Sequence, residues 1–312
     1  MLNTTPYANS VFEQPWWLDI VAPGEWGEVT VKEGDETVAR LPYVLQKGRI
    51  TLPPLTQTLG PWMKSEYRQL QPGNTQLSKQ KELIAALLGQ LPQHKSFHVT
   101  FDSANDYILP YRWLGYRYEP EFSYRLSDLH DTDALYAALN KTAKKNIKAA
   151  RNKTALVEQP TADMLLGLLD KTFGAQGRKW PHDRNLTRRI IEQSVENGRG
   201  KLIVARDPEG NLHSGAFLLY DEKVCYYLLG GSDSAFRSSG AQSLVLWEAI
   251  RFAATVSQAF DFEGSNVEGI ENFFRQFGSG RVTNYCVIKQ SFFADCLAMA
   301  KPRVKKLLGY KI

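Results

Sequence analysis

Cysteine and histidine are scarce in this chain, with three Cys and five His among 312 residues. Cys225, Cys286 and Cys296 are odd in number and widely separated, a pattern that disfavours both a disulfide scaffold and a zinc site. No apolar run approaches the ~20 residues that cross a bilayer. The first residues have neither the basic nor the apolar segment of a secretory signal. These absences predict a cytoplasmic protein that uses no metal and makes no stable insertion into a membrane.

The composition is that of a folded protein, because 43% of the residues are hydrophobic and 23% are charged. A length of 312 residues suits two domains of about 150 residues each. The 38 Lys and Arg exceed the 33 Asp and Glu and give a net charge of +5. This excess favours acidic ligands such as phosphates, nucleotides or RNA.

Residues 1–130 are predicted to form one α/β domain. Gly-containing segments at 33–36 and 47–48 have the composition of hairpin turns, and prolines between 53 and 61 favour an extended loop. The predicted strands cover 26–32, 37–46, 49–52, 97–101 and 116–126, and the predicted helices cover 14–20 and 77–91.

Residues 131–160 are predicted to be a basic helical connector, with helical periodicity over 132–153. Apolar residues recur at helical spacing, at Leu135, Leu139, Ala143 and Ile147. From residue 141 the other faces carry only cations, namely Lys141, Lys144, Lys145, Lys148, Arg151 and Lys153. Such like charges repel by a few tenths of a kcal/mol per pair. Either a polyanionic partner or a solvated basic face explains this composition.

Residues 161–312 are predicted to form a second α/β domain. Helices are expected at 163–173, 185–197, 240–255 and 268–277, strands at 201–206, 212–220, 224–229, 259–262 and 281–289, a loop at 230–239 and a helical tail at the end. In this order an antiparallel meander of strands is followed by a helix and then by a parallel strand. This arrangement forces two strands to splay apart. The splay and the N-terminus of the helix form a pocket suited to a pyrophosphate. This is the topology of the GNAT acyltransferase fold.

Two neighbouring motifs carry a more specific resemblance. Residues 260–265 read FDFEGS, and residues 269–278 read GIENFFRQFG. They resemble the FemAB-like branch of the GNAT superfamily, in which an F-D-F-x-G strand precedes a G-[IL]-x-x-[FY]-[KR]-x-x-[FW]-G helix. The helix at 240–255, with Leu244, Trp247 and Ala253, is similar to another helix of that branch.

This resemblance implies an α/β protein with mixed sheets, in which two tandem GNAT-like acyl-CoA N-acyltransferase domains flank the connector. It also implies an acyltransferase. One hypothesis is transfer from acyl-CoA to an amine of a cell-envelope, nucleotide-sugar or peptide acceptor. A second is aminoacyl transfer from aminoacyl-tRNA to a peptidoglycan precursor. A third is a degenerate tandem GNAT protein that binds nucleotide or RNA without catalysis.

Donor-binding residues follow from the family's pyrophosphate motif, [QR]-x-x-G-x-[GA]. Its first five places correspond to Arg237, Ser238, Ser239, Gly240 and Ala241. The sixth is Gln242, where the motif has a small residue, and a bulky side chain there could crowd the phosphate. The free N–H groups at the start of the following helix, together with Arg237, suit a diphosphate.

Four residues are predicted to take part in catalysis. Arg275 occupies the position of a family Lys that stabilises negative charge on the transferred carbonyl. Glu263 is the first candidate for the general base, and Asp261 is the second, although a role in bracing a neighbouring loop also explains Asp261. Tyr285 is a candidate proton donor to the leaving group.

The acceptor or an RNA is predicted to contact two further regions. Trp180 lies among cations between two helices that border the acceptor site in this fold, where an aromatic ring suits a sugar or nucleotide, although packing against the helices explains it too. For tRNA, the predicted phosphate contacts are Lys144, Lys145, Lys148 and Arg151.

Overall fold

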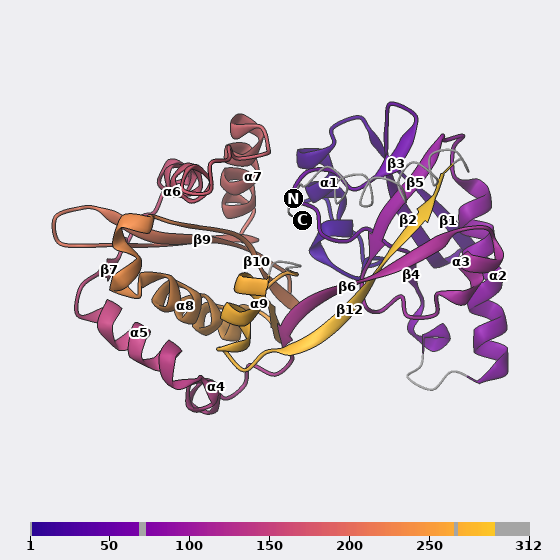
Figure 1. Cartoon of the computed structure of the whole chain (residues 1–312). Helices are drawn as coiled ribbons and strands as arrows, with labels where there is room; N and C mark the ends of the chain where they lie inside the picture. The colour runs from indigo at the N-terminus through magenta and orange to yellow at the C-terminus, as the bar shows by residue number, and fades with distance from the viewer. Residues whose placement is uncertain (1, 69–72, 265–267, 291–312) are drawn as a thin grey trace, which may run out of the picture. The chain divides into compact units, whose positions relative to one another are not determined.

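A computed structural model describes residues 2–68, 73–264 and 268–290, which form a mixed α/β protein (Figure 1). Two compact units are present. The C-terminal unit contains the residues up to Thr4, Gln14–Val21 and Glu121–Thr283, and the N-terminal unit contains Thr5–Glu13, Ala22–Pro120 and the chain from Asn284. Among the described residues, no helix is long and apolar enough to span a membrane.

The N-terminal unit is built on a five-stranded path in the order β1-β2-β3-β5-β12, with β4 paired to β2. Strand β3 is parallel to β5, and the other neighbours are antiparallel. Its elements are η1 (Val11–Glu13), β1 (Trp26–Glu33), β2 (Glu36–Gln46), β3 (Arg49–Thr51), β4 (Trp62–Met63), η2 (Ser65–Tyr67), α2 (Asn74–Gln90), β5 (Ser96–Phe101), α3 (Leu109–Trp113), the start of β6 (Arg117–Leu126) and most of β12 (Gly280–Lys289).

The C-terminal unit continues from the second part of β6 in the order β6-β11-β10-β9-β8-β7. Its helices are α1 (Pro15–Val21), α4 (Thr132–Ala138), α5 (Lys141–Arg151), α6 (Ala162–Gly174), α7 (Arg184–Glu196), η3 (Ser234–Ser239), α8 (Ala241–Val256) and α9 (Glu268–Arg275). Its strands are β7 (Ala155–Leu156), β8 (Gly200–Arg206), β9 (Leu212–Tyr220), β10 (Val224–Ser232) and β11 (Ala259–Asp261).

Helices cover both faces of the C-terminal sheet. Figure 1 shows α6 and α7 on one side of β8–β10, with α8 and α5 on the other. The β8-β9-β10 meander is antiparallel, whereas β11 is parallel to β10 and antiparallel to β6. The core beneath α8 contains Trp247, Phe260 and Phe262, each less than 5% exposed. The predicted fold class and strand order of this region are confirmed.

The connector is helical, as its periodicity predicts, but it is not one continuous helix. It is divided into α4 and α5, because Leu139 is extended and Asn140 begins a new helix by accepting a 2.7 Å hydrogen bond from the Ala143 N–H. Two other expectations need smaller corrections. Strand β10 and η3 occupy much of the predicted 230–239 loop. Helix α3 lies in a segment for which the sequence predicts no helix. The predicted C-terminal tail and Cys296 lie outside the described residues.

Neither unit is a continuous stretch of chain, in contrast to the predicted division at 1–130, 131–160 and 161–312. Helix α1 belongs to the C-terminal unit, where it packs against α7. Strand β6 passes from one unit to the other at Pro120, and β12 does so at Thr283. The chain therefore connects its two units at several points.

Candidate active site

A cavity of about 740 Å³ lies where β10 and β11 part. The two strands pair only from Val224↔Ala259 to Tyr226↔Asp261, whereas β10 continues beside β9 as far as Ser232. Residues of β10, α8, the β11–α9 loop and α9 line the space. The splay predicted from the order of elements is therefore present, and it opens a cavity large enough for a small-molecule ligand.

The start of α8 forms one wall of this cavity. Gly240 has φ 78°, and a Cβ there would collide with the backbone carbonyl of Asn146 in α5. The Ala241 N–H donates to Ser239 Oγ at 3.2 Å, while no acceptor for the Gln242 N–H is found in the described part of the chain. A free N–H at a helix N-terminus favours an anion.

Most of the predicted pyrophosphate motif lies at this wall. Arg237, Gly240 and Gln242 line the 740 Å³ cavity, and a neighbouring cavity of about 160 Å³ is lined by Ser239 and Ala241 together with Arg237 and Gln242. Ser238 is exposed and lines neither. The Gln242 side chain is also exposed.

Glu263 lines the same cavity from the loop that follows β11. It follows the end of β11 in the left-handed region, with φ 65°, which is unusual for a residue that has a side chain. Its Oε1 atom is buried and has no hydrogen-bond partner among the described residues. Burial, and then the nearby Asp261 carboxylate, raise the pKa of Glu263 well above its ordinary value, against the opposing effect of Arg125.

Asp261 holds this turn in place. Its carboxylate is 3% exposed, accepts a 2.9 Å hydrogen bond from Arg125 Nε and forms an ion pair with Arg125 Nη2 at 2.8 Å. Ser123 Oγ also donates to it, and the Glu263 N–H donates at 2.8 Å. Asp261 is not among the residues that line the cavity. The structure thus places Asp261 as a brace for the loop and leaves Glu263 as the carboxylate at the cavity.

Arg275 does not reach the cavity. It lies on α9, where it pairs with Glu271 at 2.9 Å and donates to Asn272, and its side chain is 58% exposed. The cavity is instead lined from α9 by apolar residues such as Ile270 and Phe273. The helix is present as predicted, but its register points the cation away from the wall.

Neither Tyr285 nor Trp180 lines this cavity. Tyr285 belongs to the N-terminal unit and packs edge-on against Tyr118, with ring centroids 5.9 Å apart. Trp180 donates a 3.1 Å hydrogen bond to Thr187 and packs against Phe173. Trp180 does not line the cavity, and its contacts are those of a ring packed between α6 and α7.

The basic helix α5 uses some of its cations within the fold. Lys144 donates to the Ala137 carbonyl at 2.7 Å, at the end of α4, and Arg151 pairs with Glu248 of α8 at 3.3 Å. Lys145 and Lys148 are exposed and make no ion pair with any described carboxylate. The opposite side of α5, with Ala143 and Ile147 fully buried, packs on α8.

Several residues of the cavity have no signal in the sequence. Asn146 of α5, Thr172 of α6 and Gln176 in the turn after α6 line it, and all three are distant in sequence from the motifs. Asn146 is the one uncharged polar residue among the cations at 144–148, which is the only trace that could have marked it. Among the residues described, no group of His, Cys, Asp and Glu could hold a metal ion.

Comparison with known families identifies the class of this unit. Residues 137–275 match the family model described as an acetyltransferase (GNAT) domain, so this part of the chain is a GNAT domain. The match contains the splayed strands, α8 and the Glu263 turn. No curated protein matches the chain significantly.

Solved structures share the fold of the whole chain. The crystal structure of FemX is 14% identical, covers 91% of this chain and 93% of its own, and has a TM-score of 0.65. L-PGS from Bacillus licheniformis is 12% identical with a TM-score of 0.52, covering 94% of this chain and 91% of its own. A tandem GNAT protein from the clavulanic acid biosynthesis pathway is 11% identical with a TM-score of 0.52, covering 88% of each chain.

The family match confirms the predicted resemblance to the GNAT superfamily over residues 137–275, and the FemX and tandem GNAT structures share the predicted tandem fold. They support an N-acyltransferase as the kind of activity. GNAT domains generally bind acetyl-CoA or acyl-CoA, which agrees with the anion-binding features at the start of α8.

Proposed function

We propose that this protein transfers an acyl group from acyl-CoA to an amine of a cell-envelope, nucleotide-sugar or peptide acceptor in the cytoplasm. The observation that carries the proposal is Glu263, a carboxylate of raised pKa on the wall of a cavity at the β10–β11 splay. An amine is protonated near neutral pH and must lose a proton before it can attack a thioester. A base whose pKa is raised towards neutrality suits that task.

In this mechanism Glu263 accepts the proton from the acceptor ammonium. The amine nitrogen then forms a bond to the thioester carbonyl carbon. When the carbon–sulfur bond breaks, the nitrogen gives up its second proton and the departing sulfur takes up a proton, which yields the amide and the free CoA thiol. The negative charge that develops on the carbonyl oxygen needs a donor. Our candidate is the backbone N–H of Leu228, which lines the cavity at an irregularity in the β10–β9 register.

The donor's diphosphate is assigned to the start of α8. The Gln242 N–H and the helix dipole favour a negative charge there, and Arg237 on the same wall adds a permanent cation. Arg275, which faces solvent beside Glu271, has no role in this version of the mechanism. The remaining walls of the cavity, including Gln176 in the turn after α6, are assigned to the acceptor.

The test is calorimetric titration with CoA and acetyl-CoA, followed by measurement of CoA thiol release with a panel of amines. We expect micromolar binding, about −8 kcal/mol, that Arg237→Ala abolishes. We also expect turnover that Glu263→Gln abolishes without loss of binding. The exposed Glu268 of α9 offers a matched control, since Glu268→Gln removes the same charge outside the cavity.

Binding without turnover on any amine would favour a non-catalytic GNAT protein. The absence of CoA binding would favour the second candidate, an aminoacyl transferase that uses aminoacyl-tRNA. That candidate draws support from Lys145 and Lys148, two exposed cations without a described carboxylate partner. It predicts salt-sensitive binding of aminoacyl-tRNA that the double change K145E/K148E removes.

A further inference from the structure

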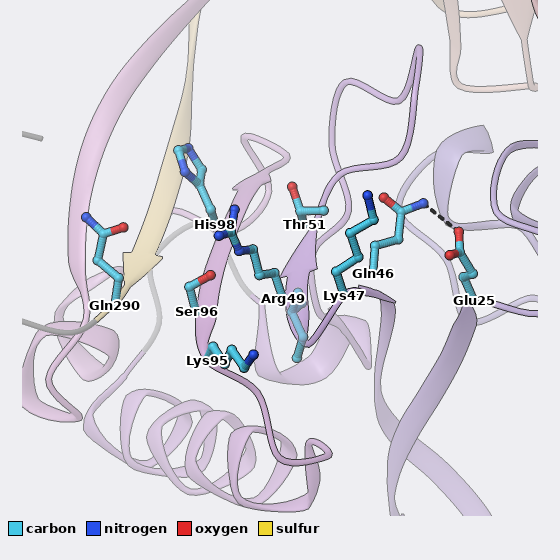
Figure 2. Close-up of a pocket in the computed structure, with 10 residues that line it drawn as sticks. Glu25, Gln46, Lys47, Arg49, Thr51, Lys95, Ser96, His98 and Gln290 are labelled. Carbon is cyan, nitrogen blue, oxygen red and sulfur yellow. Dashed lines mark hydrogen bonds between the residues drawn. The ribbon is translucent and has the colours of Figure 1, made fainter. Parts of the chain in front are cut away.

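A second large cavity, of about 870 Å³, lies entirely within the N-terminal unit (Figure 2). It is built around the two-residue β2–β3 hairpin turn, in which Lys47 and Gly48 have φ 52° and 75°. These are the left-handed conformations of a type I′ turn. The Lys95 N–H donates to the Gly48 carbonyl at 2.7 Å, which ties the turn to the start of β5.

The pairing of β3 with β5 places polar side chains together along one face. Arg49 lies beside Ser96, and Thr51 lies beside His98, as parallel partners. Ile50 and Phe97, the intervening pair, are each 1% exposed and belong to the core on the other face. The polar face is thus set on a rigid, well-packed pair of strands.

The cavity is strongly cationic. Lys47, Arg49 and Lys95 line it together with His98, and the only acidic residue in its lining is Glu25. Figure 2 shows that the Glu25 carboxylate accepts a hydrogen bond from Gln46, at 2.6 Å. Within the part of the chain that is described, no carboxylate forms an ion pair with any of the three permanent cations.

Several half-buried cations of the same unit have acidic partners. Lys64 pairs with Glu36 at 2.9 Å, Lys79 with Glu33 at 2.5 Å, and Arg117 with Glu119 at 2.5 Å. Lys47, Arg49 and Lys95 instead lie together at one cavity, without an ion pair to any described carboxylate. Their mutual repulsion is relieved when an anion binds between them.

We propose that this cavity binds a ligand that carries a diphosphate or several phosphate groups. Lys47, Arg49 and Lys95 would neutralise the phosphates, with Arg49 able to bind two oxygens of one phosphate. Thr51, Ser96 and Gln290 add polar groups suited to a sugar or further phosphate oxygens. The lining has no Phe, Tyr or Trp on which a nucleobase could stack, so recognition rests on the phosphates. The inference goes beyond the proposed transferase function and does not depend on it.

The test is calorimetric titration of the full chain with pyrophosphate. We expect saturable binding that K47A/R49A weakens by roughly tenfold or more, because each lost cation removes charge-assisted hydrogen bonds. Lys95→Ala, a single change at an exposed residue, provides a second variant with the same expected direction. The control K64A/K79A removes the same net charge from the same unit but leaves the cavity lining intact.

Pyrophosphate can also bind at the α8 wall of the GNAT domain, to which the donor's diphosphate is assigned, so every titration is repeated in an Arg237→Ala background. In that background saturable binding to the N-terminal cavity should remain, and K47A/R49A should still weaken it. Sedimentation with phosphatidylcholine vesicles that contain phosphatidic acid then distinguishes the source of the phosphate. Vesicle binding lost in K47A/R49A indicates a lipid headgroup, and pyrophosphate binding alone indicates a soluble ligand. The proposal is overturned if the wild type does not bind saturably at millimolar pyrophosphate, if K64A/K79A weakens binding equally, or if only Arg237→Ala abolishes it.

Discussion

At the scale of single residues, Glu263 is where stability and chemistry are in conflict. A left-handed backbone in a residue other than Gly costs on the order of 1–3 kcal/mol, and Glu263 has φ 65°. Its buried Oε1 lacks a described partner, and its pKa is raised. Asp261, held by Arg125 and Ser123, fixes the turn that imposes these costs. Backbone strain together with a perturbed pKa in a cavity is a combination that clusters at functional sites.

The proposed general base predicts a pH profile. Because only the ionised carboxylate accepts a proton, kcat/KM should rise with pH through the raised pKa of Glu263 and then level off. Glu263→Gln should lower kcat by about a hundredfold or more and remove this rising limb. The profile of Glu268→Gln should match that of the wild type. A rising limb that persists unchanged in Glu263→Gln would exclude Glu263 as the base.

Glu263→Gln should lower the activity of the protein but raise its thermal stability at pH 8. A Glu whose folded-state pKa is raised contributes its full stability below its unfolded pKa, and that contribution is lost as pH rises through the folded pKa. Glu263→Gln removes the ionisation, so its Tm should exceed that of the wild type at pH 8. The difference should shrink as the pH falls towards 4. Thermal unfolding by circular dichroism at both pH values measures this, and a Tm difference independent of pH would contradict it.

At the scale of elements, the entry to α8 depends on one glycine. Gly240 combines φ 78° with a site where a Cβ would strike the Asn146 carbonyl. Gly240→Ala should therefore destabilise the protein by about 2–4 kcal/mol and weaken CoA binding, as urea unfolding and calorimetry would measure. Gly167→Ala is the control, because that position lies inside α6 with no atom near its Cβ. It should stabilise by about 0.5–1 kcal/mol.

The break between α4 and α5 depends on Asn140. Its side chain caps α5 through the Ala143 N–H, and loss of such a cap costs about 1 kcal/mol. Asn140→Ala should lower the free energy of unfolding by that amount in urea denaturation, and Asn140→Asp should restore most of it. Equal losses in both variants would show that Asn140 acts by some means other than capping.

Sequence patterns predicted the strands and helices of the GNAT domain well, because their periodicity and turns are local properties. The splay, Arg237 and Glu263 followed from the order of elements and from two motifs. The direction in which the Arg275 side chain points did not follow from these patterns. It depends on the register of α9 against the core, where Phe274 is buried. The continuous helical periodicity across 132–153 concealed the cap at Asn140, because Leu139 and Ala143 remain in apolar positions on both sides of the break.

At the scale of the whole molecule, unit boundaries do not coincide with boundaries in the sequence. Strand β6 supplies the antiparallel partner of β11, through Phe260↔Leu126 and Asp261↔Arg125. A cut at residue 130, which the sequence suggests, removes this strand from the GNAT domain. It also removes Ser123 and Arg125, the partners of the buried Asp261. Long-range pairing of this kind has no local signature, which is why composition and periodicity missed it.

A pair of fragments tests this dependence. Fragment 117–290 retains β6, whereas 131–290 leaves the Asp261 charge buried without its partners, a change that costs about 3–5 kcal/mol. We expect 117–290 to unfold at higher urea concentration than 131–290, and 131–290 to be cleaved faster in limited proteolysis. Identical midpoints for the two fragments would show that β6 adds nothing to the stability of the GNAT domain.

Helix α1 has a consequence for how the protein is made. Its side chains are mostly buried, Trp16 and Trp17 among them, and the helix contacts α7, which begins at Arg184. On the ribosome this apolar helix emerges long before its partner exists. The fold of the N-terminal unit is completed later still during synthesis, since β5 pairs with β12 at residues 285–289. Neither unit can be completed until nearly the whole chain is synthesised, so nascent chains should expose Trp16 and Trp17 to chaperones until translation is almost finished.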